Sequence, residues 1–130
     1  MAEIVMVDDL NWDDEVLRSD LPVLVDNWAD WCGPCQLMEP ELEALAAEQD
    51  GRLKIAALNA DDCYELSHDV CEADLLPTCV LFVHGEAVVR LEGYRKKDEI
   101  MWEIESYLPR RPSPASDPAS APATSPSSEY

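Results

Sequence analysis

Apolar and polar residues alternate along this chain in short blocks that predict strands and helices in turn. Four runs rich in Val, Ile and Leu are typical of buried strands, at residues 4–7, 23–28, 53–58 and 79–83. A further strand is expected at residues 87–91, where it completes a hairpin after the His84-Gly85 turn. Helical segments are expected between the strands and after the last one, at residues 12–17, 34–49, 61–70 and 98–108. This order predicts an α/β fold with a central mixed β-sheet flanked by helices, in which a parallel core carries an antiparallel edge hairpin.

Two of the predicted helices carry specific local signals. Asn11 precedes the first helix, and its side-chain oxygen is expected to cap the free N–H groups there. In the third helix, Cys63, Leu66 and Val70 follow a helical spacing and are expected to share one apolar face. The first signal predicts where the helix at residues 12–17 begins. The second predicts which face of the helix at residues 61–70 is apolar.

The composition changes near residue 108. From Pro109 to Tyr130 the chain consists mostly of Pro, Ser and Ala, with Tyr130 as its only large apolar side chain. Such a segment cannot bury enough apolar surface to offset the entropy lost on ordering. We therefore expect one domain at residues 1–108 and a disordered, solubilising tail at residues 109–130, which lacks a clear P-x-x-P motif with basic flanks.

The chain is strongly acidic, with a net charge of −19 at pH 7. All but two of its 28 Asp and Glu residues lie in residues 1–108, and Arg110 and Arg111 balance the remaining two. Such a surface repels phosphate groups, so neither nucleic acid nor an anionic membrane is expected as a partner. The composition suits a high-salt cytoplasm, where ions screen the repulsion, and it equally suits a protein kept soluble by its charge.

The first residues and the cysteine count bear on the compartment. The N-terminus has neither a basic segment nor a long apolar stretch, and no segment approaches the roughly 20 apolar residues of a membrane span. Five cysteines are an odd number, which disfavours a structural disulfide framework and leaves a redox pair with three further thiols. We expect a cytoplasmic monomer.

Residues 31–35 read Trp31-Cys32-Gly33-Pro34-Cys35, between a predicted strand and a predicted helix. Two cysteines three positions apart at a helix start lie one turn apart, close enough to form a disulfide. A zinc site with four ligands would need a second pair at comparable spacing, which the chain lacks. The motif therefore indicates thiol–disulfide exchange and no metal.

A wider pattern surrounds this motif: Val25-Asp26, Trp28-Ala29, Pro40, Leu76-Pro77-Thr78, Gly85 and Gly93. At these spacings, residues 1–108 resemble the thioredoxin family, which implies the thioredoxin fold. Three positions depart from the family pattern. Asn27 stands where an aromatic residue is usual, Gln36 where Lys or Arg is frequent, and Ala57 where many bacterial members carry a buried Lys. These departures affect the tuning of the site rather than its chemistry.

The two cysteines of the motif are expected to have different roles. Cys32 should lie exposed at the helix N-terminus, where free N–H groups and the helix dipole favour the thiolate of a nucleophile. Cys35 should lie further inward and resolve the mixed disulfide. Gly33 and Pro34 keep the first turn tight, because a proline there loses no hydrogen bond.

Asp26 interrupts the apolar run at residues 23–25, and a buried carboxylate there is costly unless it is used. The resemblance implies that Asp26 lies beneath Cys35 and exchanges protons with it through a water molecule, as general base and acid. Burial is expected to raise its pKa, and Ala57 supplies no positive charge to oppose that rise. An outward-facing strand residue without a role is the alternative.

The resemblance also implies a substrate-binding surface. The Leu76-Pro77 bond corresponds to the family's cis-proline, which presents a backbone edge to an extended substrate. The residues expected to bind substrate are Trp31, Gly33, Pro34, Leu76, Pro77 and Gly93.

Taken as a family member, the chain is expected to reduce protein disulfides, to be recycled by an NADPH-dependent thioredoxin reductase, and to need no bound cofactor. Two alternatives remain: a thioredoxin-fold binding module with an incidental dithiol, and a dedicated electron donor to one enzyme. The combination of Cys32, Cys35, Asp26 and Pro77 disfavours the binding module, because binding alone needs no nucleophile and no buried base.

The remaining cysteines are interpreted mainly as packing residues. Cys63 and Cys79 lie in predicted apolar positions, where a thiol acts as a small apolar side chain. A resemblance to animal thioredoxins around Cys63 and Cys71 leaves a regulatory role open. A metal site formed by Cys63, His68 and Cys71 is disfavoured, because their helix directs them to different faces.

Overall fold

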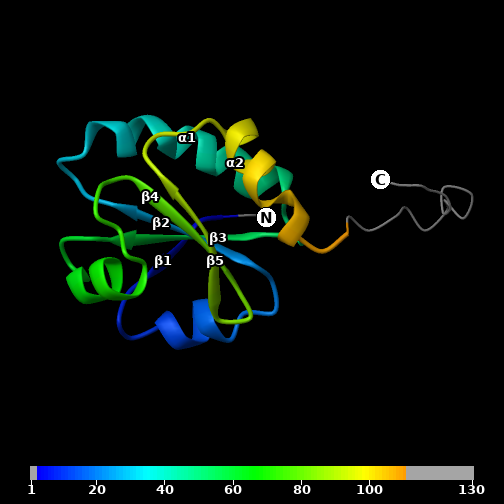
Figure 1. Ribbon diagram of the computed structural model, residues 1–130, viewed down its shortest axis with the longest axis horizontal. Coiled ribbons are helices and arrows are strands. Elements are labelled where there is room, and N and C mark those ends of the chain that lie inside the picture. The colour runs from blue at the N-terminus through cyan, green and yellow to red at the C-terminus, as the bar shows by residue number, and fades with distance from the viewer. Residues whose placement is uncertain (1–2, 111–130) are drawn as a thin grey trace, which may run out of the picture.

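Five strands form one mixed sheet in the computed structural model, which describes residues 3–110. They are β1 (Val5–Val7), β2 (Val23–Trp28), β3 (Lys54–Asn59), β4 (Thr78–Val83) and β5 (Glu86–Glu92) (Figure 1). Their spatial order is β1-β3-β2-β4-β5. β3 pairs in parallel with β1 and β2, whereas β4 pairs antiparallel with β2 and β5. The predicted mixed sheet with an antiparallel edge hairpin is confirmed.

Helices cover both faces of this sheet (Figure 1). One face lies under α1 (Gly33–Glu48) and α2 (Lys97–Ile104), which is followed by a 3₁₀ turn, η3 (Glu105–Tyr107). The core on this face contains Leu24, Met38, Leu42, Leu45, Ile55, Leu81, Ile100 and Ile104. The other face packs against η1 (Asp13–Leu17), with Val7, Trp12, Val16, Val23, Val25, Leu58, Val80 and Phe82 in its core. The central strand β2 is therefore buried on both sides, which explains its continuous apolar run.

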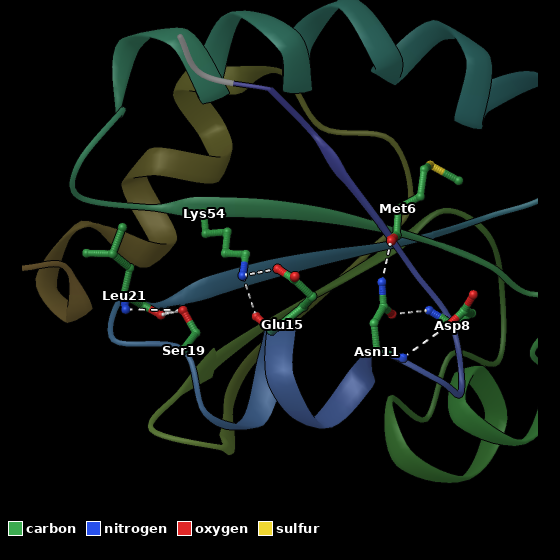
Figure 2. Close-up of polar contacts among 7 residues, drawn as sticks. All are labelled: Met6, Asp8, Asn11, Glu15, Ser19, Leu21 and Lys54. Carbon is green, nitrogen blue, oxygen red and sulfur yellow. Dashed lines mark hydrogen bonds and ion pairs between the residues drawn. The ribbon is translucent and has the colours of Figure 1, made fainter.

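The start of η1 differs from the expectation that Asn11 caps it. Asn11 Oδ1 accepts a hydrogen bond from the Asp8 N–H at 2.7 Å, and Nδ2 donates to the Met6 carbonyl at 3.0 Å (Figure 2). It is Asp8 Oδ1 that accepts from the backbone N–H groups of Leu10 and Asn11. The prediction was wrong because Asn11 and Asp8 bond to each other's backbone N–H groups in the loop before η1, and within residues 3–110 no side chain caps the start of η1 itself.

Lys54 links η1 to the sheet through two contacts with Glu15. Lys54 Nζ, at the start of β3, donates to the Glu15 carbonyl at 2.7 Å and to Glu15 Oε1 at 2.5 Å (Figure 2). Trp12, directly before η1, packs edge-to-face on Phe82 of β4, with ring centroids 5.3 Å apart. The two contacts hold η1 against the face opposite α1.

The helix after β3 is wound differently from the prediction. η2 (Leu66–Val70) is a π-helical turn, in which the Cys71 N–H bonds to the Leu66 carbonyl five residues earlier. The wider turn buries Ser67 and leaves Val70 43% exposed. The expectation that Val70 shares the apolar face of Cys63 and Leu66 is therefore wrong, because it assumed α-helical spacing.

The hairpin turn and the C-terminal helix lie near their predicted positions. His84 and Gly85 both have positive φ angles, of 50° and 83°, which confirms the tight turn between β4 and β5. α2 ends at Ile104, four residues before the predicted end, and Leu108 still packs against the core. Of the expected tail, only Pro109 and Arg110 belong to the described residues, and residues 111–130 lie outside them. Within residues 3–110, every helix is too short or too polar to cross a lipid bilayer.

Candidate active site

The two cysteines of the motif form a disulfide at the N-terminus of α1. Cys32 is the N-cap residue and Cys35 lies in the first turn, with their Cα atoms 5.3 Å apart. The Cys35 N–H donates a hydrogen bond to Cys32 Sγ at 3.2 Å. When the disulfide is reduced, this N–H and the positive end of the helix dipole favour a negatively charged sulfur at Cys32.

The burial of the pair differs from the expectation. Cys32 is only 3% exposed and Cys35 5%, so the outer cysteine is not the exposed residue that the sequence led us to expect. The disulfide packs beside Ala29, Trp28 and Leu76, which cover it from the preceding strand and from the loop before β4. In the disulfide form, the difference in burial predicted between the two cysteines is absent.

Asp26 lies in β2 and is buried, with 7% of the residue exposed. Burial raises the pKa of its carboxyl from 3.8 to about 7, and the negative charge of Glu39 acts in the same direction. A hydrogen bond from the Cys79 thiol lowers the pKa of the carboxyl and so opposes part of that rise. The alternative in which Asp26 faces solvent is therefore excluded. Its carboxyl can hold or release a proton near neutral pH.

Asp26 and Cys35 line the same pocket, which has a volume of about 890 Å³. Trp28, Glu39 and Ala57 also line it. Ala57 lies opposite Asp26 in the β2–β3 register, so a methyl group stands where a lysine would bring a positive charge. The pocket contains polar side chains and is roomy enough to admit water beside Asp26 and Cys35.

The loop before β4 contains the cis-proline that the resemblance implied. The Leu76-Pro77 peptide bond is cis, and the Pro77 carbonyl accepts a hydrogen bond from the Gly93 N–H at 2.7 Å. Gly93 has a φ of 87°, a conformation that other residues rarely adopt. On the other side, Asn27 Nδ2 donates to the Thr78 carbonyl at 2.9 Å. Asn27 therefore holds the first residue of β4, directly after the cis bond, a contact that the sequence did not reveal.

The remaining residues expected to bind substrate differ in exposure. Trp31 is 69% exposed, and Gly33 and Pro34 are exposed beside it, whereas Leu76 is partly buried and Pro77 buried. Trp31 Nε1 donates to Asp61 Oδ2 at 2.9 Å, which fixes the indole ring although it faces solvent. Sequence reasoning missed this role of Asp61, because the two residues are 30 positions apart.

The three other cysteines are reduced and buried. Burial raises the pKa of the Cys71 thiol to about 11 and that of the Cys79 thiol well above its usual value. Cys63 packs in the core on the η1 side, as expected of a small apolar side chain. Among residues 3–110, no group of three or more His, Cys, Asp or Glu side chains is placed to hold a metal ion.

Comparison with known proteins indicates the family to which this chain is similar. A family model described as Thioredoxin matches residues 3–106. The chloroplastic thioredoxin M5 of Oryza sativa subsp. japonica is 36% identical over 106 residues, which cover 82% of this chain and 61% of the relative. A thioredoxin of Mycobacterium tuberculosis (strain ATCC 25618 / H37Rv) is 36% identical over 105 residues, covering 81% of this chain and 90% of the relative.

A third relative joins two proteins in one chain. It is the bifunctional thioredoxin reductase/thioredoxin of Mycobacterium leprae (strain TN), 36% identical over 105 residues that cover 81% of this chain and 23% of the relative. This chain therefore spans about three fifths of the length of its plant relatives and about a quarter of the bifunctional one. The family model covers most of the chain, and with these relatives it shows that the chain belongs to the thioredoxin family.

Proposed function

We propose that this protein is a thiol–disulfide oxidoreductase that reduces protein disulfides through Cys32 and Cys35. The observation that carries the proposal is the Cys32–Cys35 disulfide at the start of α1, which shares a pocket with the buried carboxyl of Asp26. In the reduced protein, the same atoms provide a nucleophile, a resolving thiol and a proton acceptor.

The first step forms a mixed disulfide. The Cys32 thiolate attacks one sulfur of the substrate disulfide, so that an S–S bond forms to Cys32 and the substrate bond breaks. The departing substrate sulfur leaves as a thiolate and takes a proton from solvent. The N–H groups at the start of α1 support this step, because they stabilise negative charge on the attacking sulfur.

The second step closes the protein disulfide. Cys35 gives its proton to the Asp26 carboxylate through water in the shared pocket, and the Cys35 thiolate then attacks Cys32 Sγ. The bond between Cys32 and the substrate breaks, and the second substrate sulfur leaves as a thiolate that takes a proton from solvent. The protein dithiol has become a disulfide, the substrate disulfide a dithiol, and Asp26 returns its proton to solvent.

Substrate is proposed to bind on the surface around the disulfide. The backbone next to the cis Leu76-Pro77 bond offers hydrogen bonds to an extended chain, and Trp31, Gly33, Pro34 and Gly93 provide the adjoining surface. The indole of Trp31 is already held by Asp61, so little ordering is needed when a partner binds.

A thioredoxin reductase is the proposed source of electrons. The printed name of the Mycobacterium leprae relative joins a thioredoxin reductase and a thioredoxin in one chain, which supports this pairing. The protein is further proposed to be cytoplasmic and monomeric. The three reduced, buried cysteines support a reducing compartment, and the acidic composition argues against nucleic acid and anionic membrane as partners.

Single-cysteine variants test the proposal directly. The wild-type protein, supplied with a thioredoxin reductase and NADPH, should reduce a small disulfide-bonded protein. Cys32→Ser should be inactive, while Cys35→Ser should accumulate a covalent mixed disulfide visible on a non-reducing gel. Cys63→Ser is the matched control and should retain activity. Equal trapping by both active-site variants would refute the assigned roles, and reduction of only one partner protein would favour a dedicated electron donor.

A further inference from the structure

Cys79 lies directly opposite Asp26 on the neighbouring strand. The two residues are partners in the antiparallel β2–β4 register, so their side chains project to the same face of the sheet. Cys79 is 1% exposed, and its Sγ lies 3.8 Å from Asp26 Oδ1, oriented as a hydrogen-bond donor. The thiol therefore faces the carboxyl from within the core.

Within residues 3–110, this thiol is the only hydrogen-bond donor to the Asp26 carboxyl. Among the hydrogen bonds of residues 3–110, no other one reaches an oxygen of Asp26. The strand on the other side contributes Ala57, whose methyl group can neither donate a proton nor carry a charge. Oδ1 is occupied by the thiol, whereas Oδ2 has no partner within the described residues.

The charged groups near the carboxyl are mostly negative. Glu39 and Glu43 of α1, Glu3 before β1, and Asp30 after β2 line the same pocket as Asp26. Glu39 raises the pKa of the Asp26 carboxyl. The positive charge of Arg95 lowers the pKa of the Cys79 thiol, but by less than burial and Asp26 raise it. A buried thiol beside a carboxylate keeps its proton, because both burial and the neighbouring negative charge raise its pKa. Cys79 therefore remains a donor while Asp26 changes charge.

We propose that Cys79 is a positioning residue for proton transfer: its thiol holds Asp26 Oδ1 and leaves Oδ2 to exchange the proton with Cys35. The inference rests on the proposed function, in which Asp26 accepts the proton of Cys35. During that step the proton moves from the Cys35 sulfur to Asp26 Oδ2, and the Cys79 S–H bond stays intact. A cysteine in the core thus acts on the reaction without being oxidised or reduced.

The proposal predicts the sign of a measurable change. A hydrogen bond to the ionised carboxylate stabilises that form, so its loss should raise the pKa of Asp26 above about 7. A single weak hydrogen bond from a thiol at this distance corresponds to a shift of roughly half a pH unit. With fewer ionised carboxylates at neutral pH, the closing of the protein disulfide should slow, and its pH profile should move upward by the same amount.

The test compares donors and non-donors at position 79 in the full-length chain. Cys79→Ala and Cys79→Val remove the donor, the second while filling the space, and Cys79→Ser restores a donor. Cys63→Ala is the matched control, because it removes a buried thiol from the opposite face of the sheet. The Asp26 carboxyl is titrated by carbon-13 NMR of aspartate-labelled oxidised protein, with its signal assigned by its absence in Asp26→Asn.

Both non-donor variants should raise the pKa of Asp26 and shift the pH profile of disulfide reduction, while Cys79→Ser and Cys63→Ala should leave both near the wild-type values. An unchanged pKa in the folded non-donor variants overturns the inference, and so does an equal rise in Cys79→Ser. If Asp26→Asn reduces disulfides with an unaltered rate and pH profile, the proposed role of Asp26 itself fails, whatever the result at position 79.

Discussion

Arg52 and Glu105 form an ion pair directly before the start of β3, at the opposite end of the sheet from the disulfide. Arg52 Nη2 lies 2.6 Å from Glu105 Oε2, and the arginine is 4% exposed. Its other nitrogens donate to Gln49 Oε1 at 2.6 Å and to the Pro109 carbonyl at 2.9 Å. The Arg52 guanidinium therefore links Gln49, directly after α1, to Glu105 of η3 and to Pro109.

Arg52→Leu should lower the free energy of unfolding by about 2–4 kcal/mol, because three hydrogen bonds are lost and the buried Gln49 oxygen is left without a partner. Arg52→Lys should also be destabilised, since an ammonium group cannot reproduce the planar fork. Urea unfolding measures both. Arg90→Leu is the matched control, because the Arg90–Glu92 pair is partly exposed and should contribute no more than about 1 kcal/mol. Similar losses at positions 52 and 90 would contradict this account.

A chain that ends at Arg110 should unfold at the same temperature as the full-length chain and reduce disulfides at the same rate. The deleted residues 111–130 are mostly Pro, Ser and Ala, and the truncation keeps the Arg52–Pro109 hydrogen bond. Thermal unfolding by circular dichroism and the reductase assay measure the two properties. A drop in either would show that the deleted segment contacts the domain.

Added salt should raise the melting temperature. Residues 1–108 contain all but two of the 28 acidic residues and all but two of the nine basic ones, so repulsion among like charges destabilises the folded form. Sodium chloride between 10 mM and 0.5 M shortens the screening length from about 30 Å to a few ångströms. The effect should shrink near pH 5, where part of the carboxylates are protonated. A melting temperature that is unchanged by salt at pH 8 would refute the argument.

The sheet and the reactive motif could be predicted because their signals are local. A strand buried on both faces, such as β2, must be apolar along its whole length, and Asp26 stands out within it. The Cys32 and Cys35 pair is likewise visible, since its spacing along one helical turn already brings the sulfurs together.

The contacts that tune the site could not be predicted, because they join residues far apart in sequence. Cys79 and Asp26 are 53 positions apart, as are Arg52 and Glu105, and only the strand register and helix packing bring them together. The burial of Cys32 depends in the same way on Leu76 in a distant loop. Even the local prediction for Val70 failed, because apolar spacing does not distinguish an α-helical turn from a π-helical one.

Asp26→Asn should slow disulfide reduction near neutral pH and stabilise the oxidised protein. In the folded state the pKa of Asp26 is about 7, above the value of about 3.9 expected for the unfolded chain. Between these values the folded state binds the proton more tightly, so rising pH removes stability from the wild type. The amide variant has no such loss. Its advantage should begin near pH 4, grow by roughly 2–3 kcal/mol between pH 5 and pH 8, and level off above the folded pKa.

Urea unfolding of both proteins at several pH values measures this growth, because the difference between them removes the contribution of every other titrating group. Asp20→Asn is the matched control, since Asp20 is exposed and its replacement should give no advantage that depends on pH. If the two variants behave alike, the Asp26 carboxyl is solvated in the folded protein and cannot hold a proton at neutral pH. A pH-dependent gain in stability without slower reduction would instead show that the buried carboxyl does not carry the proton of Cys35.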